Sequence, residues 1–450
     1  MIGRDSSVNR TPPPRLLPSV TTPLLTLYSA ALVLALAATA PWWLRELRPA
    51  GKYREGFAER LGRIPRRRLH APAAGEVTLW IHAVSVGEVL AAVPLVAALR
   101  SALPHARCYV STTTRTGQQI ARARFGADSV FYYPADFAFA VRAWLRFLRP
   151  SLVVLVESEF WPRFLIEAAR TGVPVAVINA RISDRSWPRY QRLAALWRPL
   201  LGTLSLVLAQ SDRDAQRLRA LGAPAASAIG NLKYDLPPPL PTPLLDQLRQ
   251  AIQAGAPVLV CGSTLAGEEA LLLPLLPEHT VTLLAPRHPE RFDEVAALLQ
   301  ASGRPWSPLS LWRRDPQPIA PGTLLLLDSV GELAPLYALA QVAIVGGGFL
   351  HAGGHNPLEP ASLGKPVVIG TGYANFLEIV TTLRAADAIR IAGLPEIQQT
   401  IAHLLADPAQ AAALGERARA VCAASSGATS RVLSALLPLL QPQPALGTGA

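Results

Sequence analysis

The chain has 450 residues, of which 50% are hydrophobic and 16% charged, and its formal net charge is +12. This length exceeds what one hydrophobic core fills, so we expect two or three domains, and the charge favours anionic partners. The sequence argues against a nucleic-acid partner, because it contains no zinc finger, basic helix or basic sheet studded with aromatic residues. Its three cysteines lack metal-ligand spacing and are typical of reduced core thiols.

The first predicted element is an apolar segment without charged residues from Leu16 to Leu44. Its centre, residues 24–40, is about long enough to span a bilayer as a helix. Basic residues are concentrated in residues 45–68, and the positive-inside rule then places everything after residue 45 in the cytoplasm. The same basic residues suit anionic lipid headgroups. We therefore predict a membrane anchor over residues 21–44, after a polar, proline-rich lead over residues 1–20; spanning both leaflets and lying in one stay open as alternatives.

The body repeats a pattern of short apolar strand, loop and helix, which is typical of a parallel sheet covered on both faces. A first domain over residues 45–235 contains strands at 77–83, 108–111, 152–157, 173–180 and 204–210. A proline-rich linker over residues 236–243 precedes a second domain, residues 244–425, with strands at 257–263, 279–286, 322–329, 341–348 and 365–372. A C-terminal helix and tail occupy residues 426–450. The predicted fold class is α/β, with two doubly wound, Rossmann-like domains facing a cleft that holds the active site.

Polar residues follow the first strand, where a doubly wound sheet binds its ligands. Ser85 shapes a turn and Glu88 lies at the start of the next helix. The helix dipole alone favours an acid at this position. A carboxylate that points into the cleft as a general base is the alternative, and both interpretations stay open.

The next strand ends carry further candidates. Thr114 and Arg115 lie at a helix start that suits an anion, although ordinary capping explains the threonine equally well. Glu157 and Glu159 follow a buried strand and lie on one side if that strand continues, where they hold a sugar hydroxyl or cap the next helix.

Two basic residues complete the candidates of the first domain. Arg181 follows another strand, in a polar loop that either binds an acceptor phosphate or is simply solvated. Lys233 lies just before the linker, where it is able to face the cleft.

Residues 345–360 read VGGGFLHAGGHNPLEP and form the most informative stretch of the chain. Glycine lets the backbone approach a ligand, and a glycine-rich turn with exposed amides at a helix start suits a phosphate. Asn356 caps the predicted helix and Glu359, in its first turn, is placed to bind ribose hydroxyls. Nucleotide or nucleotide-sugar binding is therefore preferred over a purely structural turn.

These motifs resemble those of one family, the transferases of 3-deoxy-D-manno-octulosonic acid (Kdo) in lipopolysaccharide assembly, over nearly the whole chain after its first twenty residues. The motifs that carry the resemblance are GKYREGFAERLG (51–62), HAVSVGE (82–88), STTTRTG (111–117), VESEFWP (156–162), NARISDRS (179–186), GNLKYD (230–235), GSTLAGEE (262–269), APRHPER (285–291) and GGGFLHAGGHNPLEP (346–360).

The resemblance implies an architecture of the GT-B type and inverting transfer from CMP-Kdo to a lipid A precursor, lipid IVA, without a metal or other cofactor. It implies that Glu88 is the catalytic base. It places the enzyme at the cytoplasmic face of the inner membrane, beside an anionic membrane surface. The donor-binding residues that it implies are Ser263, Arg287, Gly347, Gly348, Asn356 and Glu359, and the acceptor or cleft residues are Ser85, Thr114, Arg115, Glu157, Glu159, Arg181 and Lys233.

Two other classes of function stay open on the residues alone. One is another GT-B enzyme that acts on a UDP- or GDP-sugar, because those sites need the same glycine-rich turn and ribose carboxylate. The other is a non-catalytic membrane-bound protein of GT-B type. The number of Kdo residues transferred and the oligomeric state do not follow from the sequence.

Overall fold

The computed structural model describes residues 21–40, 55–73, 75–235 and 239–440. The chain divides into an N-terminal unit, Met1–Leu236 with Ser426–Ala450, and a C-terminal unit, Pro237–Ser425. The predicted lead over residues 1–20, the start of the basic cluster and the first residues of the linker lie outside the described residues.

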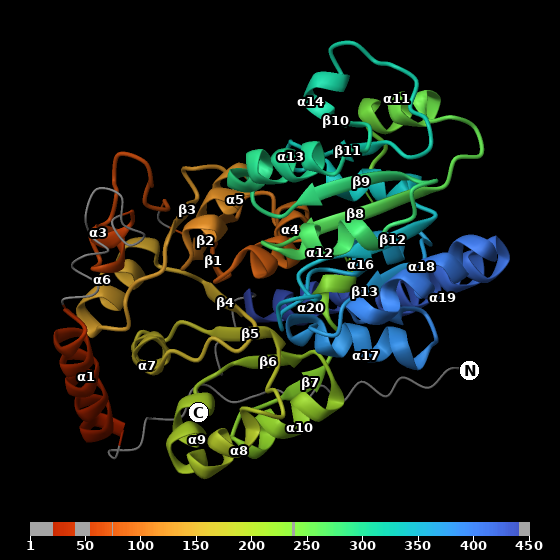
Figure 1. Ribbon diagram of the computed structural model, residues 1–450. Coiled ribbons are helices and arrows are strands. Elements are labelled where there is room, and N and C mark those ends of the chain that lie inside the picture. The colour runs from red at the N-terminus through yellow and green to blue at the C-terminus, as the bar shows by residue number, and fades with distance from the viewer. Residues whose placement is uncertain (1–20, 41–54, 74, 236–238, 441–450) are drawn as a thin grey trace, which may run out of the picture. The chain divides into compact units, whose positions relative to one another are not determined.

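The N-terminal unit is built on a seven-stranded parallel sheet (Figure 1). Its central strands are buried throughout, as expected for a sheet covered on both faces: β4 is a continuous run of Leu and Val, and β1 has the sequence TLWIH. In sheet order the strands are β3 (Val130–Tyr132), β2 (Arg107–Thr112), β1 (Thr78–His82), β4 (Leu152–Val156), β5 (Val175–Ala180), β6 (Leu206–Ala209) and β7 (Ala226–Ala228).

Helices cover both faces of this sheet. Two hydrophobic cores lie on its opposite sides, one with Trp80 and Trp144 and the other with Leu79 and Leu95. The helices are α1 (Thr21–Ala38), α3 (Phe57–Arg60), α4 (Val86–Ala102), α5 (Arg115–Phe125), α6 (Ala138–Leu148), α7 (Pro162–Arg170), α8 (Trp187–Arg192), α9 (Ala194–Leu201), α10 (Asp212–Ala220), η1 (Leu232–Asp235), α20 (Ala428–Leu436) and η6 (Leu437–Leu440).

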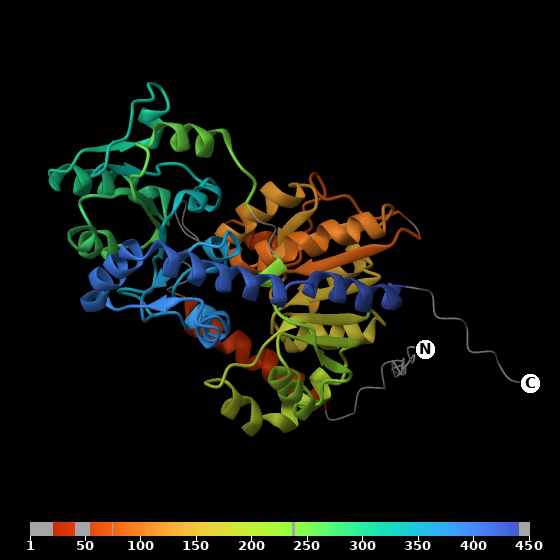
Figure 2. The same cartoon turned by 90° about the vertical axis from the view of Figure 1, so that its right-hand side faces the viewer.

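The C-terminal helix α20 belongs to the N-terminal unit, although it follows the whole second sheet in sequence. Val432 and Leu436 of α20 are fully buried in the same core as residues of α4, and Figure 2 shows the blue helix beside the orange one. The carboxylate of Asp235 accepts hydrogen bonds from the backbone N–H groups of Gly427 (2.6 Å) and Thr429. The last helix is thus fixed by the end of the first sheet domain.

The C-terminal unit repeats the plan with a second seven-stranded parallel sheet (Figure 1). Its strands in sheet order are β10 (Trp306–Pro308), β11 (Leu324–Leu326), β9 (Val281–Pro286), β8 (Val258–Thr264), β12 (Val342–Val345), β13 (Val367–Ile369) and β14 (Arg390–Ile391). Its helices are α11 (Pro243–Ala251), α12 (Glu268–Leu272), η2 (Leu273–Leu275), η3 (Pro289–Arg291), α13 (Phe292–Ala301), α14 (Leu309–Trp312), α15 (Leu333–Leu336), η4 (Tyr337–Leu339), α16 (Leu358–Ser362), η5 (Ala374–Phe376), α17 (Leu377–Ala385), α18 (Leu394–Ala406) and α19 (Pro408–Ser425).

The predicted fold class is confirmed, since both units are doubly wound parallel sheets and every predicted strand overlaps an observed one. The structure adds β3, β7, β10 and β14, which the sequence pattern did not reveal. Each has three residues or fewer and lies at or near a sheet edge, so its apolar run is too short to stand out from a loop.

Among the described residues, only Pro408–Leu440 is long and apolar enough to cross a membrane by length and composition. This stretch comprises α19, α20 and η6, and Gly427 divides it with a left-handed backbone (φ 89°). Leu414 of α19 and Leu436 of α20 are fully buried in hydrophobic cores. We therefore assign these helices to the fold.

Helix α1 falls in the predicted anchor but contributes a shorter apolar stretch, Thr26–Ala35. Its Leu27 and Leu34 are 68% and 69% exposed, which leaves an apolar surface that the other described residues do not cover. Tyr28 donates a hydrogen bond to Asp136 (2.9 Å), whose carboxylate also accepts the first N–H groups of α7. A spanning anchor over residues 21–44 is thus not confirmed and stays a prediction.

Candidate functional site

The centre of the first sheet is its topological switch point, where ligands of doubly wound sheets bind. Strands β1 and β4 are neighbours there, and the chain continues from them toward opposite edges of the sheet. Glu88 lies in the first turn of α4, which follows β1, and Glu157 directly follows β4. The fold therefore brings these two predicted residues to the same carboxyl edge.

Glu88 is a buried carboxylate with few hydrogen-bond donors. Its side chain accepts the backbone N–H of Val84 at 2.7 Å and the hydroxyl of Ser85 at 3.0 Å, and the residue is 8% exposed. Burial, and then the negative charges of Glu157 and Glu159, raise the pKa of Glu88 to about 8, and the two donors offset only part of this rise. Such a carboxyl group is poised to accept a proton near neutral pH.

Glu157 does not continue β4, contrary to the predicted alternation with Glu159. The strand ends at Val156, and Glu157 adopts a left-handed backbone conformation with φ 64°. Non-glycine residues in this region are strained and concentrate at functional sites. Its carboxylate forms an ion pair with the ammonium group of Lys233 at 3.1 Å. Two residues that the sequence placed far apart thus meet beside Glu88.

Glu159 completes a group of three carboxylates. Its side chain accepts the indole N–H of Trp161 at 3.1 Å, and burial, together with Glu157, raises its pKa. The negative charge of Glu159 also contributes to the raised pKa of Glu88, so the two carboxyl groups lie within electrostatic reach of each other.

Lys233 is held in place through its backbone by a chain of buried amides. Its N–H donates to the side chain of Asn231 (3.0 Å), whose amide donates to Gln210 (3.1 Å). Gln210 in turn donates to the carbonyl of Asn179 (3.0 Å), and the Asn179 side chain accepts the N–H of Leu232 (3.0 Å). Asn179 and Asn231 lie in the motifs at 179–186 and 230–235, but their contacts with Gln210 join three separate strand ends, which no local pattern predicts.

The other candidates of this unit have structural contacts of their own. Arg181 lies half-buried after β5, and its backbone N–H donates to the hydroxyl of Ser158 (2.9 Å), next to Glu157. The hydroxyl of Thr114 accepts the N–H of Gly117 (3.0 Å) as the cap of α5 and also contacts the carbonyl of Val84 (3.3 Å). Ordinary capping therefore explains Thr114, while its second contact links it to the turn that holds Glu88.

Arg115 is exposed at the first position of α5. It thus lies at the same carboxyl edge of the sheet as Thr114, where its guanidinium group is open to an anionic ligand.

The second sheet has its own switch point, between β8 and β12. Ser263, near the end of β8, has a left-handed backbone (φ 57°), as Glu157 has in the other unit. The glycine-rich turn follows β12 and packs tightly: a side chain at Gly346 would come within 2.8 Å of the Ser263 carbonyl. Glycine is thus required where the turn meets β8.

Amides near the start of this turn already have an acceptor within the chain. The N–H groups of Gly347 (2.7 Å) and Phe349 (2.9 Å) both donate to the carboxylate of Glu268, in the first turn of α12. Glu268 was not among the predicted site residues, although it belongs to the GEE sequence that follows β8.

Donor-site candidates gather beside this turn. Burial raises the pKa of Glu359, and the positive charge of Arg287 and a hydrogen bond from Asn356 partly offset the rise. Asn356 also accepts the N–H of Leu358 (3.1 Å), although the N-cap position of α16 is Pro357, one residue later than predicted. Burial, and then the charge of Arg287, lower the pKa of His355 to about 4, so this ring is neutral near pH 7.

Gly348 also lies in this turn, and its carbonyl accepts the N–H of Gly372 (2.9 Å). No group of three or more His, Cys, Asp or Glu side chains that could hold a metal ion occurs within the described parts of the chain. The candidate donor residues are an arginine, one carboxylate, an amide, a serine and a tight glycine turn.

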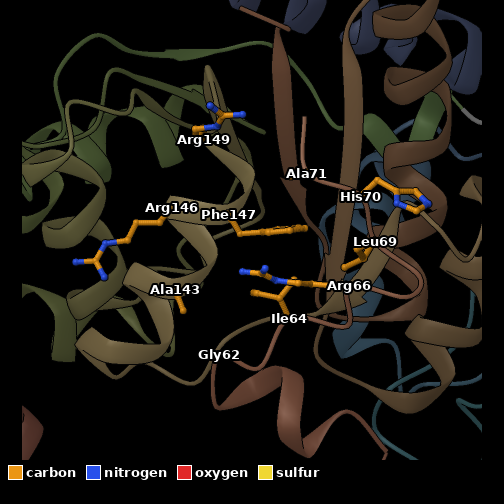
Figure 3. Close-up of a pocket in the computed structure, with 10 residues that line it drawn as sticks. All are labelled: Gly62, Ile64, Arg66, Leu69, His70, Ala71, Ala143, Arg146, Phe147 and Arg149. Atoms are coloured by element: carbon orange, nitrogen blue, oxygen red, sulfur yellow. The ribbon is translucent and has the colours of Figure 1, made fainter. Parts of the chain in front are cut away.

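A cavity of ≈ 730 Å³ in the N-terminal unit lies apart from Glu88 and Glu157 of the same unit. Residues 62–71 and the end of α6 line it, and Figure 3 shows Arg66 reaching from one wall toward Phe147 on the other. Arg149 comes before the amino end of β4, whereas Glu88 and Glu157 follow the carboxyl ends of β1 and β4. The cavity is thus a separate, basic feature.

Comparisons with known proteins agree on one family. Residues 55–236 match the family described as 3-deoxy-D-manno-octulosonic-acid transferase (kdotransferase). A curated protein named 3-deoxy-D-manno-octulosonic acid transferase from Bordetella pertussis is 38% identical over 426 residues, 90% of this chain and 97% of its own length. A protein of the same name from Haemophilus influenzae is 34% identical and covers 87% of this chain and 92% of its own length.

Among solved structures, a UDP-GlcNAc 2-epimerase from Neisseria meningitidis is 15% identical and aligns with a TM-score of 0.53. It covers 80% of this chain and 100% of its own. At this identity the likeness shows the fold alone, which is of the GT-B type.

Proposed function

The chain belongs to the 3-deoxy-D-manno-octulosonic acid transferase family and is a glycosyltransferase, and we propose that it transfers Kdo from CMP-Kdo to a lipid A precursor, lipid IVA, with inversion at the anomeric carbon. The observation that carries this proposal is the environment of Glu88, a buried carboxylate with two donors and a pKa raised to about 8.

In the proposed reaction Glu88 is the general base. A primary hydroxyl of the acceptor donates its proton to Glu88 while the hydroxyl oxygen attacks the anomeric carbon of Kdo. The bond between that carbon and the phosphate oxygen of the donor breaks, and CMP leaves with the electron pair. A pKa near the working pH suits this step, because the base is then both available and strong. Ser85 orients the carboxylate through its 3.0 Å hydrogen bond.

The other candidates divide between the two substrates. The acceptor substrate is bound by residues at the same sheet edge as Glu88, namely Glu157, Glu159, Arg181 and Lys233. Their carboxylates accept hydrogen bonds from its hydroxyl groups, and their cations pair with its phosphate groups. Ser263, Arg287, Asn356 and Glu359 gather at the second switch point and bind the donor, with Glu359 on the ribose.

We place the enzyme on the cytoplasmic face of the inner membrane, anchored by residues 21–44. The uncovered leucines of α1 and the positive charge of the chain support this arrangement. The arginines of the basic cavity, Arg66, Arg146 and Arg149, match the anionic surface on which a phosphorylated lipid acceptor lies.

The test is transfer by the full-length protein with CMP-Kdo and a tetraacylated, bis-phosphorylated lipid A precursor, with mass spectrometry of the product. Glu88→Gln keeps the shape of the side chain but removes the base, so we expect its transfer rate to fall by about 10²–10⁴-fold. The mass of the wild-type product also counts the sugars transferred.

Glu76→Gln is the matched control. Glu76 precedes β1 as Glu88 follows it, and its carboxylate pairs with Arg107 at 3.1 Å, so its loss should leave transfer unchanged. Equal activity of the wild type and Glu88→Gln would remove Glu88 as the base. A folded wild type that transfers nothing from CMP-Kdo, but accepts a UDP- or GDP-sugar, would overturn the proposed donor.

A further inference from the structure

Three amides of the glycine-rich turn already bind an anion, and that anion belongs to the chain itself. Glu268 is fully buried, and its two oxygens accept N–H groups from both sides of the second switch point. The donors are Gly347 (2.7 Å), Phe349 (2.9 Å) and Leu350 (3.4 Å) of the turn and Leu265 (2.9 Å) after β8. A carboxylate anion suits this concave set of donors, in the way that a bound phosphate does elsewhere.

This arrangement leaves no room for a phosphate in the same place. A side chain at Gly346 would come within 2.9 Å of the Glu268 carboxylate, which shows how closely the backbone encloses it. A phosphate oxygen and a carboxylate oxygen compete for the same N–H groups. Glu268 is part of the chain, so its carboxylate is always present beside these donors. The phosphate of a donor must therefore be bound by groups other than these four N–H donors, among them the side chains beside the turn.

Those side chains supply limited positive charge. Arg287 influences both Glu359 and His355, so it lies close to the turn, and His288 and His351 also act on His355. Burial and these neighbours lower the pKa of His355 to about 4, so it adds no charge near pH 7. The positive charge of Arg287 is enough to bind one phosphate. A second phosphate would extend toward the negative charge of Glu268.

We propose that Glu268 is a specificity-determining residue, which fills the amide site of a second phosphate and so selects a nucleoside monophosphate sugar over a nucleoside diphosphate sugar. The proposal rests on the proposed function insofar as the C-terminal unit binds the donor. It gives a function to Glu268, a buried carboxylate that takes no part in the proposed transfer step at Glu88.

The test measures nucleotide binding by the full-length protein in detergent, by titration calorimetry with CMP, CDP, UMP and UDP. We expect the wild type to bind the monophosphate at least about tenfold more tightly than the diphosphate of the same base, because like charges repel strongly at a buried site. Glu268→Gln removes the charge and releases amide donors. Its preference for the monophosphate should therefore shrink by about tenfold.

Glu294→Gln is the control, since Glu294 is an exposed acid of the same unit that pairs with Arg291 (3.0 Å). It should leave the ratio of the two affinities unchanged. The role of Glu268 is overturned if folded Glu268→Gln keeps the wild-type ratio of the two affinities. It is also overturned if the wild type binds the diphosphate more tightly than the monophosphate. The wild-type comparison decides the question even if Glu268→Gln fails to fold.

The choice of bases separates this proposal from the proposed function. Tight binding of UMP in place of CMP contradicts a cytidine donor but supports the selection of one phosphate. Tight binding of CDP supports a cytidine site but contradicts the role of Glu268. Absence of binding by all four nucleotides counts against both.

Discussion

Glu88 and Glu268 occupy matching places in the two units, yet their surroundings are opposite. Each lies in the first turn of the helix that follows the switch-point strand, β1 or β8. Each is buried and accepts an N–H from the loop between strand and helix, that of Val84 or Leu265. The equivalent position of each unit therefore holds a buried carboxylate.

The neighbouring strand decides what each carboxylate does. Across the first switch point, β4 leads to Glu157 and Glu159, whose negative charges help to raise the pKa of Glu88. Across the second, β12 leads to a glycine-rich turn whose N–H groups point at Glu268. A carboxylate that faces other carboxylates binds protons more tightly, whereas the oxygens of one that faces several donors are occupied by hydrogen bonds.

Substitutions of Glu88 and Glu268 should differ most in their effect on stability in alkaline solution. The pKa of Glu88 is about 8 in the folded protein and near 4.5 when exposed, so the native state binds more protons between these values. Glu88 thus lowers stability as the pH rises through that window. We expect Glu88→Gln to be more stable than the wild type at pH 9 by a few kcal/mol, since each pKa unit is worth about 1.4 kcal/mol.

Scanning calorimetry of the full-length protein at several pH values checks this prediction. The gain in the melting temperature of the N-terminal unit should grow from pH 5 to pH 9. A gain that stays constant with pH would show that ionised Glu88 is not disfavoured by its surroundings.

Glu268→Gln should act in the opposite direction. Glutamine keeps one acceptor oxygen but turns an amide group toward backbone N–H donors, so hydrogen bonds to a charged acceptor are lost. We expect the C-terminal unit to lose about 2 kcal/mol, because a bond to a charged group contributes about 1.5–3 kcal/mol. Calorimetry should show a lower melting temperature for that unit, and a neutral or stabilising substitution would contradict the comparison.

A smaller effect concerns the pH dependence of transfer. Ionised Glu88 is the active form, so kcat/KM should rise with pH, with an apparent pKa of about 8. Glu157→Gln removes a negative charge that contributes to this value and leaves Lys233 nearby. The rise should therefore move to lower pH, by about one unit. The pH profile of Glu76→Gln is the control, and a profile of Glu157→Gln that coincides with the wild type would remove Glu157 from the environment of Glu88.

The sequence predicted Glu88 and missed the role of Glu268 for a physical reason. The donors of Glu88 are three and four residues away, so a strand, a turn and a helix start are enough to place it. The donors of Glu268 in the glycine-rich turn are 79, 81 and 82 residues away, and only the pairing of β8 with β12 brings them together. Local pattern therefore predicts the first carboxylate, while the second depends on tertiary structure.

The same distinction applies to the fold. Buried strands such as β4 are apolar runs that the sequence displays directly. The end of β4 at Val156, by contrast, depends on the left-handed backbone of Glu157, which no apolar pattern reveals. The ion pair of Glu157 with Lys233 likewise joins segments that only the sheet order brings together.

The smallest predicted effect compares two helix caps, one in each unit. Thr114 caps α5 through Gly117 (3.0 Å) and Thr242 caps α11 through Leu245 (3.3 Å), so each substitution by alanine should cost about 1 kcal/mol of stability. Only Thr114 also contacts the carbonyl of Val84, whose N–H donates to Glu88.

Thr114→Ala should therefore reduce kcat a few-fold, while Thr242→Ala leaves transfer unchanged at the same loss of stability. Thr114→Ser, which keeps the hydroxyl, should restore the rate. Equal rates for the two alanine variants would mean that Thr114 does no more than cap its helix, and that the turn before α4 holds Glu88 without support from its neighbour.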